Sequence, residues 1–125
     1  MINVTVPIYI NVSKKKVSLM GLNWYRNAHY QVLDKSKKEY LSLVDLDIDG
    51  DPIMDGTIHV HFKIFLKRKG SDGGNIRSVI EKFVLDAVKK LGYIVDDHAE
   101  IIVSDSSEYH FDKDFPRAEI TFTRK

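Results

Sequence analysis

The sequence predicts one α/β domain of the α+β kind, with a mixed β-sheet and helices packed on one face of it. The length of 125 residues fits a single domain and leaves little room for two cores. Two stretches alternate apolar and polar residues, which indicates strands, and a third carries apolar residues at helical spacing. Residues 1–125 are therefore expected to form one domain.

The first strand is expected over residues 2–10, where every second residue is apolar. Pro7 suggests an edge position for this strand, because proline cannot donate a hydrogen bond to a neighbouring strand. Lys14–Lys16 then marks a loop. Residues 22–30 are rich in aromatic and polar groups and have no clear period, so no regular element is assigned to them.

A short helix is expected around Asp34 to Val44. Asp34 or Ser36 is a candidate for its N-cap, because both side chains can accept a hydrogen bond from the first turn. Tyr40, Leu41 and Val44 share one face of this helix.

The clearest strand covers residues 58–66, and the basic triplet Lys67–Lys69 follows it. The next stretch predicts a long helix from an apolar stripe at helical spacing. Its members are Ile76, Val79, Ile80, Phe83, Val84, Ala87, Val88 and Leu91. Gly92 stands where a C-cap glycine belongs, and Lys89 and Lys90 suit the negative end of the helix dipole.

Two more strands are expected towards the C-terminus. One covers Ala99 to Val103, and the other covers Arg117 to Arg124. A polar connection over Ser104 to Pro116 is expected to join them.

Composition narrows the classes of function. The net charge is only +1, so any nucleic-acid binding depends on local clusters: Lys14–Lys16, Lys35 with Lys37 and Lys38, and Lys67–Lys69. Each cluster taken alone is typical of a solvated surface. The absence of cysteine excludes disulfides and thiolate metal sites. No signal peptide or membrane-length apolar run is recognised, which predicts a cytoplasmic protein without membrane contact.

The acidic stretch over residues 45–56 partly matches a calcium loop. Asp45, Asp47, Asp49 and Gly50 occupy its first, third, fifth and sixth positions. Gly56 stands where the bidentate glutamate belongs, so an acidic surface turn is the main expectation.

His59 and His61 lie two residues apart on the expected strand and therefore share a face of the sheet. Two histidines could hold a metal together, but no third ligand is evident from the spacing. Ordinary sheet-face histidines are the expectation.

The stretch from Gly70 to Asp97 carries the strongest functional signal. A basic loop is followed by Asp72, a helix with Lys82, and then the pair Asp96–Asp97. Taken singly, each of these residues has an ordinary structural interpretation. Asp72 would be a helix cap, Lys82 would form a surface ion pair with Asp86, and the aspartate pair would belong to a turn. Together, in this order, they favour a metal-dependent nucleic-acid site.

In this order the chain resembles the RusA family of Holliday-junction resolvases, which are small dimeric Mg²⁺-dependent endonucleases common in phages and prophages. The similarity covers nearly the whole chain. Its segments are LNWYRNAHY (22–30), KKEYLSLV (37–44), IHVHFKIFLKRK (58–69), KFVLDAVKKLGYIVDDHAEI (82–101) and RAEITF (117–122). The fourth segment is the most specific, with Val88 where the family has leucine.

The resemblance implies a metal site and a DNA surface. Asp72, Asp96 and Asp97 would hold Mg²⁺, with Mn²⁺ as an alternative ion. Asp72, Lys82 and Asp97 would form the catalytic set. The DNA contacts would come from Arg26, Lys67, Arg68, Lys69 and Asn75. The implied protein is a homodimer that acts on branched DNA in a bacterial or phage-infected cell.

The chain departs from the family in two places. Gly74 stands where the family's motif before the helix has a second aspartate. The interval from Asn75 to Lys82 is also about one helical turn longer than in the family, which keeps the helix face roughly in phase. One carboxylate fewer would weaken Mg²⁺ binding, because this ion prefers oxygen ligands.

Three interpretations of the sequence therefore stand. The first is a Mg²⁺-dependent endonuclease of branched DNA. The second is a RusA-like module that binds DNA junctions without cutting them, which the glycine at position 74 favours. The third is an unrelated small α/β protein whose helix and aspartate pair are structural. Trp24 and Tyr25 are expected to pack, whereas Arg26 and His29 are open to either role.

Overall fold

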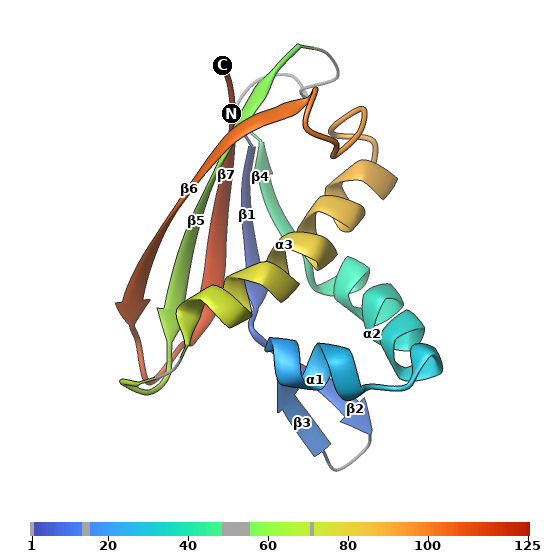
Figure 1. Cartoon of the computed structure of the whole chain (residues 1–125), viewed down its shortest axis with the longest axis vertical. Coiled ribbons are helices and arrows are strands. Elements are labelled where there is room, and N and C mark those ends of the chain that lie inside the picture. Colours follow the sequence, from blue (N-terminus) through green and yellow to red (C-terminus); the bar gives the residue numbers. More distant parts are fainter. Residues whose placement is uncertain (1, 14–15, 49–55, 71) are drawn as a thin grey trace.

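The computed structural model describes residues 2–13, 16–48, 56–70 and 72–125, which form a small α+β domain with one hydrophobic core (Figure 1). Its elements are β1 (Ile2–Pro7), β2 (Tyr9–Ser13), β3 (Lys16–Leu19), α1 (Leu22–Asn27), α2 (Tyr30–Leu43), β4 (Asp45–Ile48), β5 (Ile58–Leu66), α3 (Gly73–Lys90), β6 (Ile102–Phe111) and β7 (Arg117–Arg124). Among the described helices, none is both long and apolar enough to cross a membrane.

The main sheet has the strand order β4-β1-β7-β5-β6 and is mixed, as predicted. β5 and β6 run parallel, and the remaining neighbours run antiparallel. β2 and β3 form a separate two-stranded sheet. The parallel pair is joined through α3, which crosses one face of the sheet (Figure 1).

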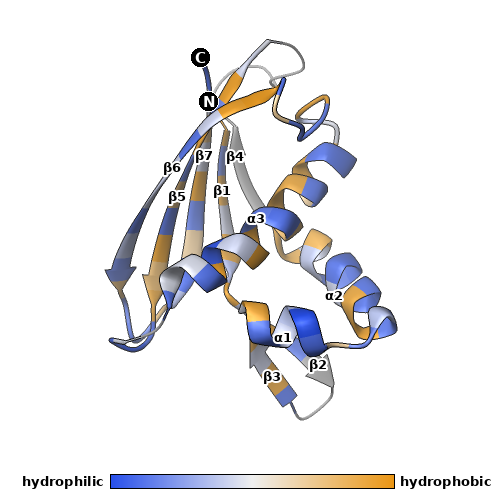
Figure 2. Ribbon diagram, viewed as in Figure 1, coloured by the Kyte–Doolittle hydropathy of each residue, from blue (hydrophilic) through white to orange (hydrophobic). Residues whose placement is uncertain are grey.

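The predicted alternation of β1 and β5 produces the core. In β1, Ile2, Val4 and Val6 are buried while their neighbours are half-buried, and β5 alternates in the same way along its whole length. Buried residues of α3 cover these strands, and the hydropathy along α3 alternates accordingly in Figure 2. Burial of the apolar face is the main stabilising term for such a layer.

α3 is the helix that the apolar stripe predicts, and its C-terminal cap is confirmed. The backbone N–H of Gly92 donates to the carbonyl of Lys89, and that of Tyr93 donates to Val88, both at 3.0 Å. This pair of bonds is a Schellman motif, which needs a left-handed residue at its end. Gly92 supplies it with a φ of +81°.

Several expectations for the first half were wrong. β1 is not an edge strand, since it lies between β4 and β7; Pro7 is tolerated because β4 pairs only with Ile2–Thr5. Residues 22–27, for which the sequence predicts no regular element, form α1. α2 starts at Tyr30 and not near Asp34, because the ring of His29 caps it by accepting a hydrogen bond from Gln31.

The basic and acidic loops of the first half also differ from expectation. Lys16 begins β3, while residues 14–15 lie outside the described part of the chain. Asp45–Ile48 is the edge strand β4, not a turn. Residues 49–55 lie outside the described residues, so most of the calcium-loop candidate does as well.

The second half contains the largest error. Ser104–Phe111, expected as a polar connection, belongs to the ten-residue strand β6, and Ala99–Ile101 precedes that strand in a turn. β6 lies at the edge of the sheet, and most of it is hydrophilic in Figure 2. Since neither of its faces is fully buried, it lacks the alternation that identifies half-buried strands.

Candidate nucleic-acid interface and metal ligands

Asp72 caps the N-terminus of α3. Its Oδ1 accepts the backbone N–H of Asn75 at 3.2 Å, and its Oδ2 accepts the side-chain amide of Asn75 at 2.9 Å. A carboxylate here satisfies a free N–H of the first turn and interacts favourably with the positive end of the helix dipole. Asp72 is therefore the helix cap that it is expected to be when taken singly, and this cap places the side chain of Asn75 beside its carboxylate.

Asp72 and Asn75 also line a hollow of about 390 Å³. Its other walls are Ser18, Leu19, Gly21, Leu22, Asn23, Trp24 and Ile76. Trp24 and Tyr25 pack on Phe83, with ring centroids 6.0 and 6.4 Å away, which confirms their expected packing role. This packing fixes α1 against α3, so two segments of the implied site lie side by side.

The basic loop is directly next to this end of α3. Lys67, Arg68 and Lys69 are exposed and link the end of β5 to the start of α3. Lys67 also lines a second hollow of about 390 Å³ together with Lys113. Exposed cations beside a helix N-terminus form an environment that favours phosphate.

Lys82 and Arg26 lie farther along the same side. Lys82 is exposed and its Nζ lies 5.1 Å from the centroid of the Tyr25 ring. Its expected partner Asp86 instead pairs with Lys90 at 3.2 Å. Lys82 is about 15 Å from Asp72 along the helix, at about 1.5 Å per residue. Arg26 is exposed in the last turn of α1.

Asp96 and Asp97 lie just beyond the C-terminal end of α3 and are bound by a lysine. Lys89 Nζ lies 3.2 Å from Asp96 Oδ1 and 4.0 Å from Asp97 Oδ1. The backbone N–H of Asp97 donates to Asp96 at 2.8 Å. This bond, together with Lys89, lowers the pKa of Asp96 to about 2, and Asp96 in turn raises the pKa of Lys89.

The two sets of predicted metal ligands are far apart in one protomer. Asp72 caps the first turn of α3 and Asp96–Asp97 follow its last turn, and 18 residues of helix span about 27 Å. A single Mg²⁺ therefore does not fit between Asp72 and Asp97 of one chain. Among the described residues, no three histidine, aspartate or glutamate side chains are grouped to hold a metal ion. A centre containing both aspartates would need two protomers.

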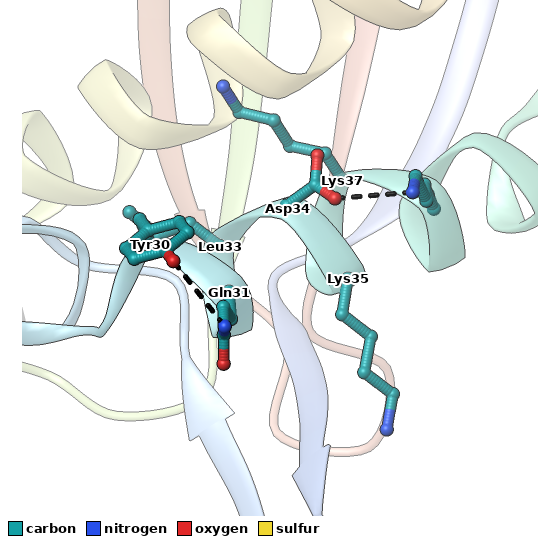
Figure 3. A pocket seen from close by; sticks show the side chains of 7 residues that line it. Tyr30, Gln31, Leu33, Asp34, Lys35 and Lys37 are labelled. Carbon is teal, nitrogen blue, oxygen red and sulfur yellow. Dashed lines mark hydrogen bonds and ion pairs between the residues drawn. The ribbon is translucent and has the colours of Figure 1, made fainter.

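The remaining lysine cluster lies on α2. Lys35, Lys37 and Lys38 line a hollow of about 580 Å³ with Tyr30, Gln31, Leu33 and Asp34. Every one of these residues belongs to α2, so the hollow is an open stretch of one helix surface. In Figure 3, Lys37 reaches towards α3 and Lys35 points away from it, while Lys38 pairs with Asp34 at 3.2 Å. The three charges diverge and do not form one anion site.

The face of the sheet opposite α3 carries a polar ladder that sequence reasoning missed in part. His59 and His61 share a face, as expected, and hydrogen-bond to serines of β6. Glu108 accepts from His61 at 2.9 Å and from His110 at 2.6 Å, and these two bonds, that of His110 first, lower its pKa. The missed partners all belong to β6, which the sequence did not identify as a strand.

Next to this ladder, planar groups are stacked. His110 lies on Phe65 with centroids 5.1 Å apart, and the guanidinium of Arg117 lies 3.8 Å from Phe65 and 4.8 Å from Phe115. Asp112 and Glu119 pair with Arg117 at 2.8 and 2.7 Å. Because two carboxylates neutralise this arginine, the stack is a structural feature of the open face and not a phosphate site.

A comparison of the chain with family models and with curated proteins finds no match in either.

Proposed function

We propose that the protein is a RusA-like protein that binds branched DNA at the N-terminal end of α3. One observation carries the proposal: the exposed triplet Lys67–Lys69 directly adjoins the helix N-terminus, where backbone N–H groups and the dipole also favour anions. Three cations on one loop supply affinity for phosphate without reading sequence. The preference for branched DNA follows from the resemblance of the whole chain to the resolvases.

Electrostatics at the other end of α3 supports this choice of surface. Asp96 and Asp97 lie there with the negative end of the dipole, so phosphate is disfavoured. Lys89 and Lys90 are each paired with a carboxylate, at 3.2 Å in both cases. A DNA backbone is therefore expected to lie along the loop and not along the C-terminal turn.

Mg²⁺-dependent cleavage is the second candidate. The observation that favours it is that Asp72 lines a hollow beside the same loop, so a carboxylate would lie close to the bound phosphate. Mg²⁺ in such sites commonly uses one or two carboxylates, water and substrate phosphate. Lys82 would add positive charge on the same side of the helix. The separation of Asp97 means that a centre with both aspartates requires a dimer.

The test of binding is titration of a labelled four-way junction and of a linear duplex of the same sequence. Replacing Lys67, Arg68 and Lys69 together by alanine is expected to lower junction affinity at least about tenfold and to reduce the salt slope by about 3. The matched control replaces Lys35, Lys37 and Lys38 and removes the same charge from α2. Equal losses in both variants would assign the effect to net charge and contradict the proposed surface.

Cleavage is tested with the same junction in Mg²⁺ and then in Mn²⁺. Paired nicks that disappear in both Asp72→Asn and Asp97→Asn would support the endonuclease. Tight junction binding without nicks in either ion would leave the protein as a binding module. A protein that neither binds nor cuts the junction would refute both DNA proposals.

A further inference from the structure

Exposed aromatic rings gather at the C-terminal end of β6. Tyr109 is 43% exposed and Phe111 is 53% exposed, although phenylalanine is among the residues most often found fully buried. In the described part of the chain, the other strongly exposed phenylalanine and tyrosine rings are Tyr30 on α2 and Phe115 in the turn after β6. In Figure 1, this end of β6 lies beside the end of β5, near the start of α3.

Tyr109 and Phe111 share the face of the sheet that α3 covers. The register of β6 with β5 is regular over residues 104–111, so side chains alternate between the two faces of the sheet there. Asp105 accepts a hydrogen bond from Arg77 of α3 at 2.8 Å, which assigns the odd-numbered residues of this stretch to the helix side. Both rings therefore lie on the same side of β6 as α3.

The basic loop begins and ends beside these two rings. Phe111 pairs with Leu66 in the sheet, and Lys67–Lys69 follow Leu66 directly. The loop leads to Gly73, the first residue of α3, which lies so close to Tyr109 that an added Cβ would collide with the ring. Phe111 comes two residues later on the strand, beyond the start of the helix. Exposed cations and exposed rings thus occupy the same end of the molecule.

The charge around the rings is mainly positive. Lys67–Lys69 and Lys113 are exposed, and Lys113 lines one hollow together with Lys67. The exposed carboxylates of the two loops are Asp72 and Asp114, so cations outnumber them. Rings beside an excess of cations form a typical site for single-stranded nucleic acid, whose bases stack on the rings while its phosphates meet the cations. An apolar protein segment would cover the rings but would gain nothing from the cations.

The spacing of the rings suits a nucleotide chain. Two residues of a strand span about 6.7 Å, at about 3.3–3.4 Å per residue. A stacked DNA strand advances about 3.4 Å per nucleotide, so the two ring positions are about two base steps apart. The contact with Gly73 also holds the ring of Tyr109 in place, which lowers the entropy lost when a base stacks on it.

We propose that Tyr109 and Phe111 stack with unpaired bases of the DNA that the basic loop holds, so that the preferred substrate is branched DNA with a single-stranded arm. This inference rests on the proposed DNA-binding function and names the class of DNA that the site selects. A base in a duplex must be unpaired and unstacked before it can reach a ring, whereas a base in a single strand needs no such step. A fully paired junction is held through its phosphates and is bound more weakly.

Two labelled four-way junctions of the same sequence test the preference: one is fully paired, and the other has one arm left single-stranded. A linear duplex completes the set. We expect the natural sequence to bind the junction with the single-stranded arm at least about tenfold more tightly than the paired one. The double variant Tyr109→Leu and Phe111→Leu keeps apolar side chains but removes both rings. The ratio of its two affinities is expected to fall to about one.

The matched control is the double variant Phe115→Leu and Tyr30→Leu, which also replaces two exposed rings. Phe115 lies 4.8 Å from the guanidinium of Arg117 on the opposite face of the sheet, and Tyr30 lies on α2. This control is expected to keep the preference. The exchange Tyr109→Phe with Phe111→Tyr retains both rings and is expected to keep it as well.

The affinity ratio of the natural sequence decides the matter without any variant. Equal affinity for the two junctions, with tight binding to both, would overturn this inference and leave the DNA-binding proposal standing. A preference that survives the loss of Tyr109 and Phe111, or that falls equally in the control variant, would also overturn it. Absence of binding to all three DNAs would refute the DNA-binding proposal and this inference with it.

Discussion

The two ends of α3 present opposite chemistry. At the N-terminal end, the carboxylate of Asp72 accepts hydrogen bonds from the backbone and the side chain of Asn75, and exposed cations of the adjoining loop come just before it in the chain. At the C-terminal end, Asp96 and Asp97 are held by Lys89. The helix dipole reinforces this difference, because its positive end faces the loop and its negative end faces the lysine.

The types of charge in the sequence therefore do not decide which end of α3 is suited to bind phosphate. Both ends have aspartate and lysine within a few residues of each other. Lys89 and Lys90 are paired with carboxylates at the C-terminal end, and the side chains of Lys67–Lys69 in the loop are exposed. The end with the exposed cations is the one that we assign to phosphate.

The largest expected effect comes from a substitution in the buried middle of α3. Loss of packing there destabilises the helix and therefore the structure at both of its ends. Phe83 is buried and is contacted by Trp24, Tyr25 and Tyr40. Phe83→Ala is expected to lower the free energy of unfolding by about 3–5 kcal/mol, measured by urea denaturation. Leu91→Ala, at a position 43% exposed, should change it by about 0.5 kcal/mol. Similar losses in both variants would contradict the assigned core.

At the C-terminal end, Gly92→Ala is expected to cost about 1–2 kcal/mol. The reason is the φ of +81°, which the Schellman motif requires and which an L side chain adopts only with strain. Gly74→Ala is the control at the other end, because an added Cβ there would make ordinary van der Waals contact, 3.5 Å from Asp72 Oδ1. Thermal denaturation should show a lower Tm for the Gly92 variant alone, and the reverse order would be evidence against this cap.

At the N-terminal end, Asp72→Ala is expected to lower the free energy of unfolding by about 1 kcal/mol through loss of the cap. Asp72→Asn keeps a good capping residue and should cost less, since asparagine and aspartate are similar N-caps. The two variants therefore separate the structural role of Asp72 from its charge. Equal destabilisation in urea titrations would show that the charge, and not the cap, stabilises this end.

The smallest expected effect is the pH dependence of the contribution that Asp96, at the C-terminal end of α3, makes to stability. Asp96 has a folded pKa of about 2, below its ordinary value of 3.8, so its contribution to stability is complete above pH 4 and is lost as the pH falls towards 2. The stability difference between the natural protein and Asp96→Asn should therefore narrow between pH 4 and pH 2. Denaturation at several pH values measures this difference, and a gap that stays constant over that range would contradict the Lys89–Asp96–Asp97 arrangement.

Periodicity predicted the parts of the fold that are buried on one side only. β5 and α3 were identified because a regular core face produces a regular pattern. β6 and α1 were missed for physical reasons: both faces of β6 stay partly exposed, and α1 has only six residues, too few for a stripe. His29 was missed as a cap because the ring of histidine replaces the usual serine or aspartate at that position.

The sequence predicted which residues belong to the candidate site, but it did not predict how far apart they lie in the structure. The order of residues placed Asp72 beside Asn75 and Asp96 beside Asp97, as the structure has them. It did not show that a straight helix keeps the two pairs apart, although the predicted helix length already carried that information. The partner of each charge, such as Asp96 for Lys89 or Lys90 for Asp86, depends on packing and loop geometry that spacing alone does not fix.

The most direct test of the difference between the two ends is one junction titration with three proteins. These are the natural sequence, the alanine variant of Lys67–Lys69, and a variant with Lys89 and Lys90 replaced by alanine. Our account predicts at least about a tenfold loss of affinity for the loop variant and nearly unchanged affinity for the C-terminal variant. The opposite order would place DNA at the C-terminal end of α3 and contradict the account.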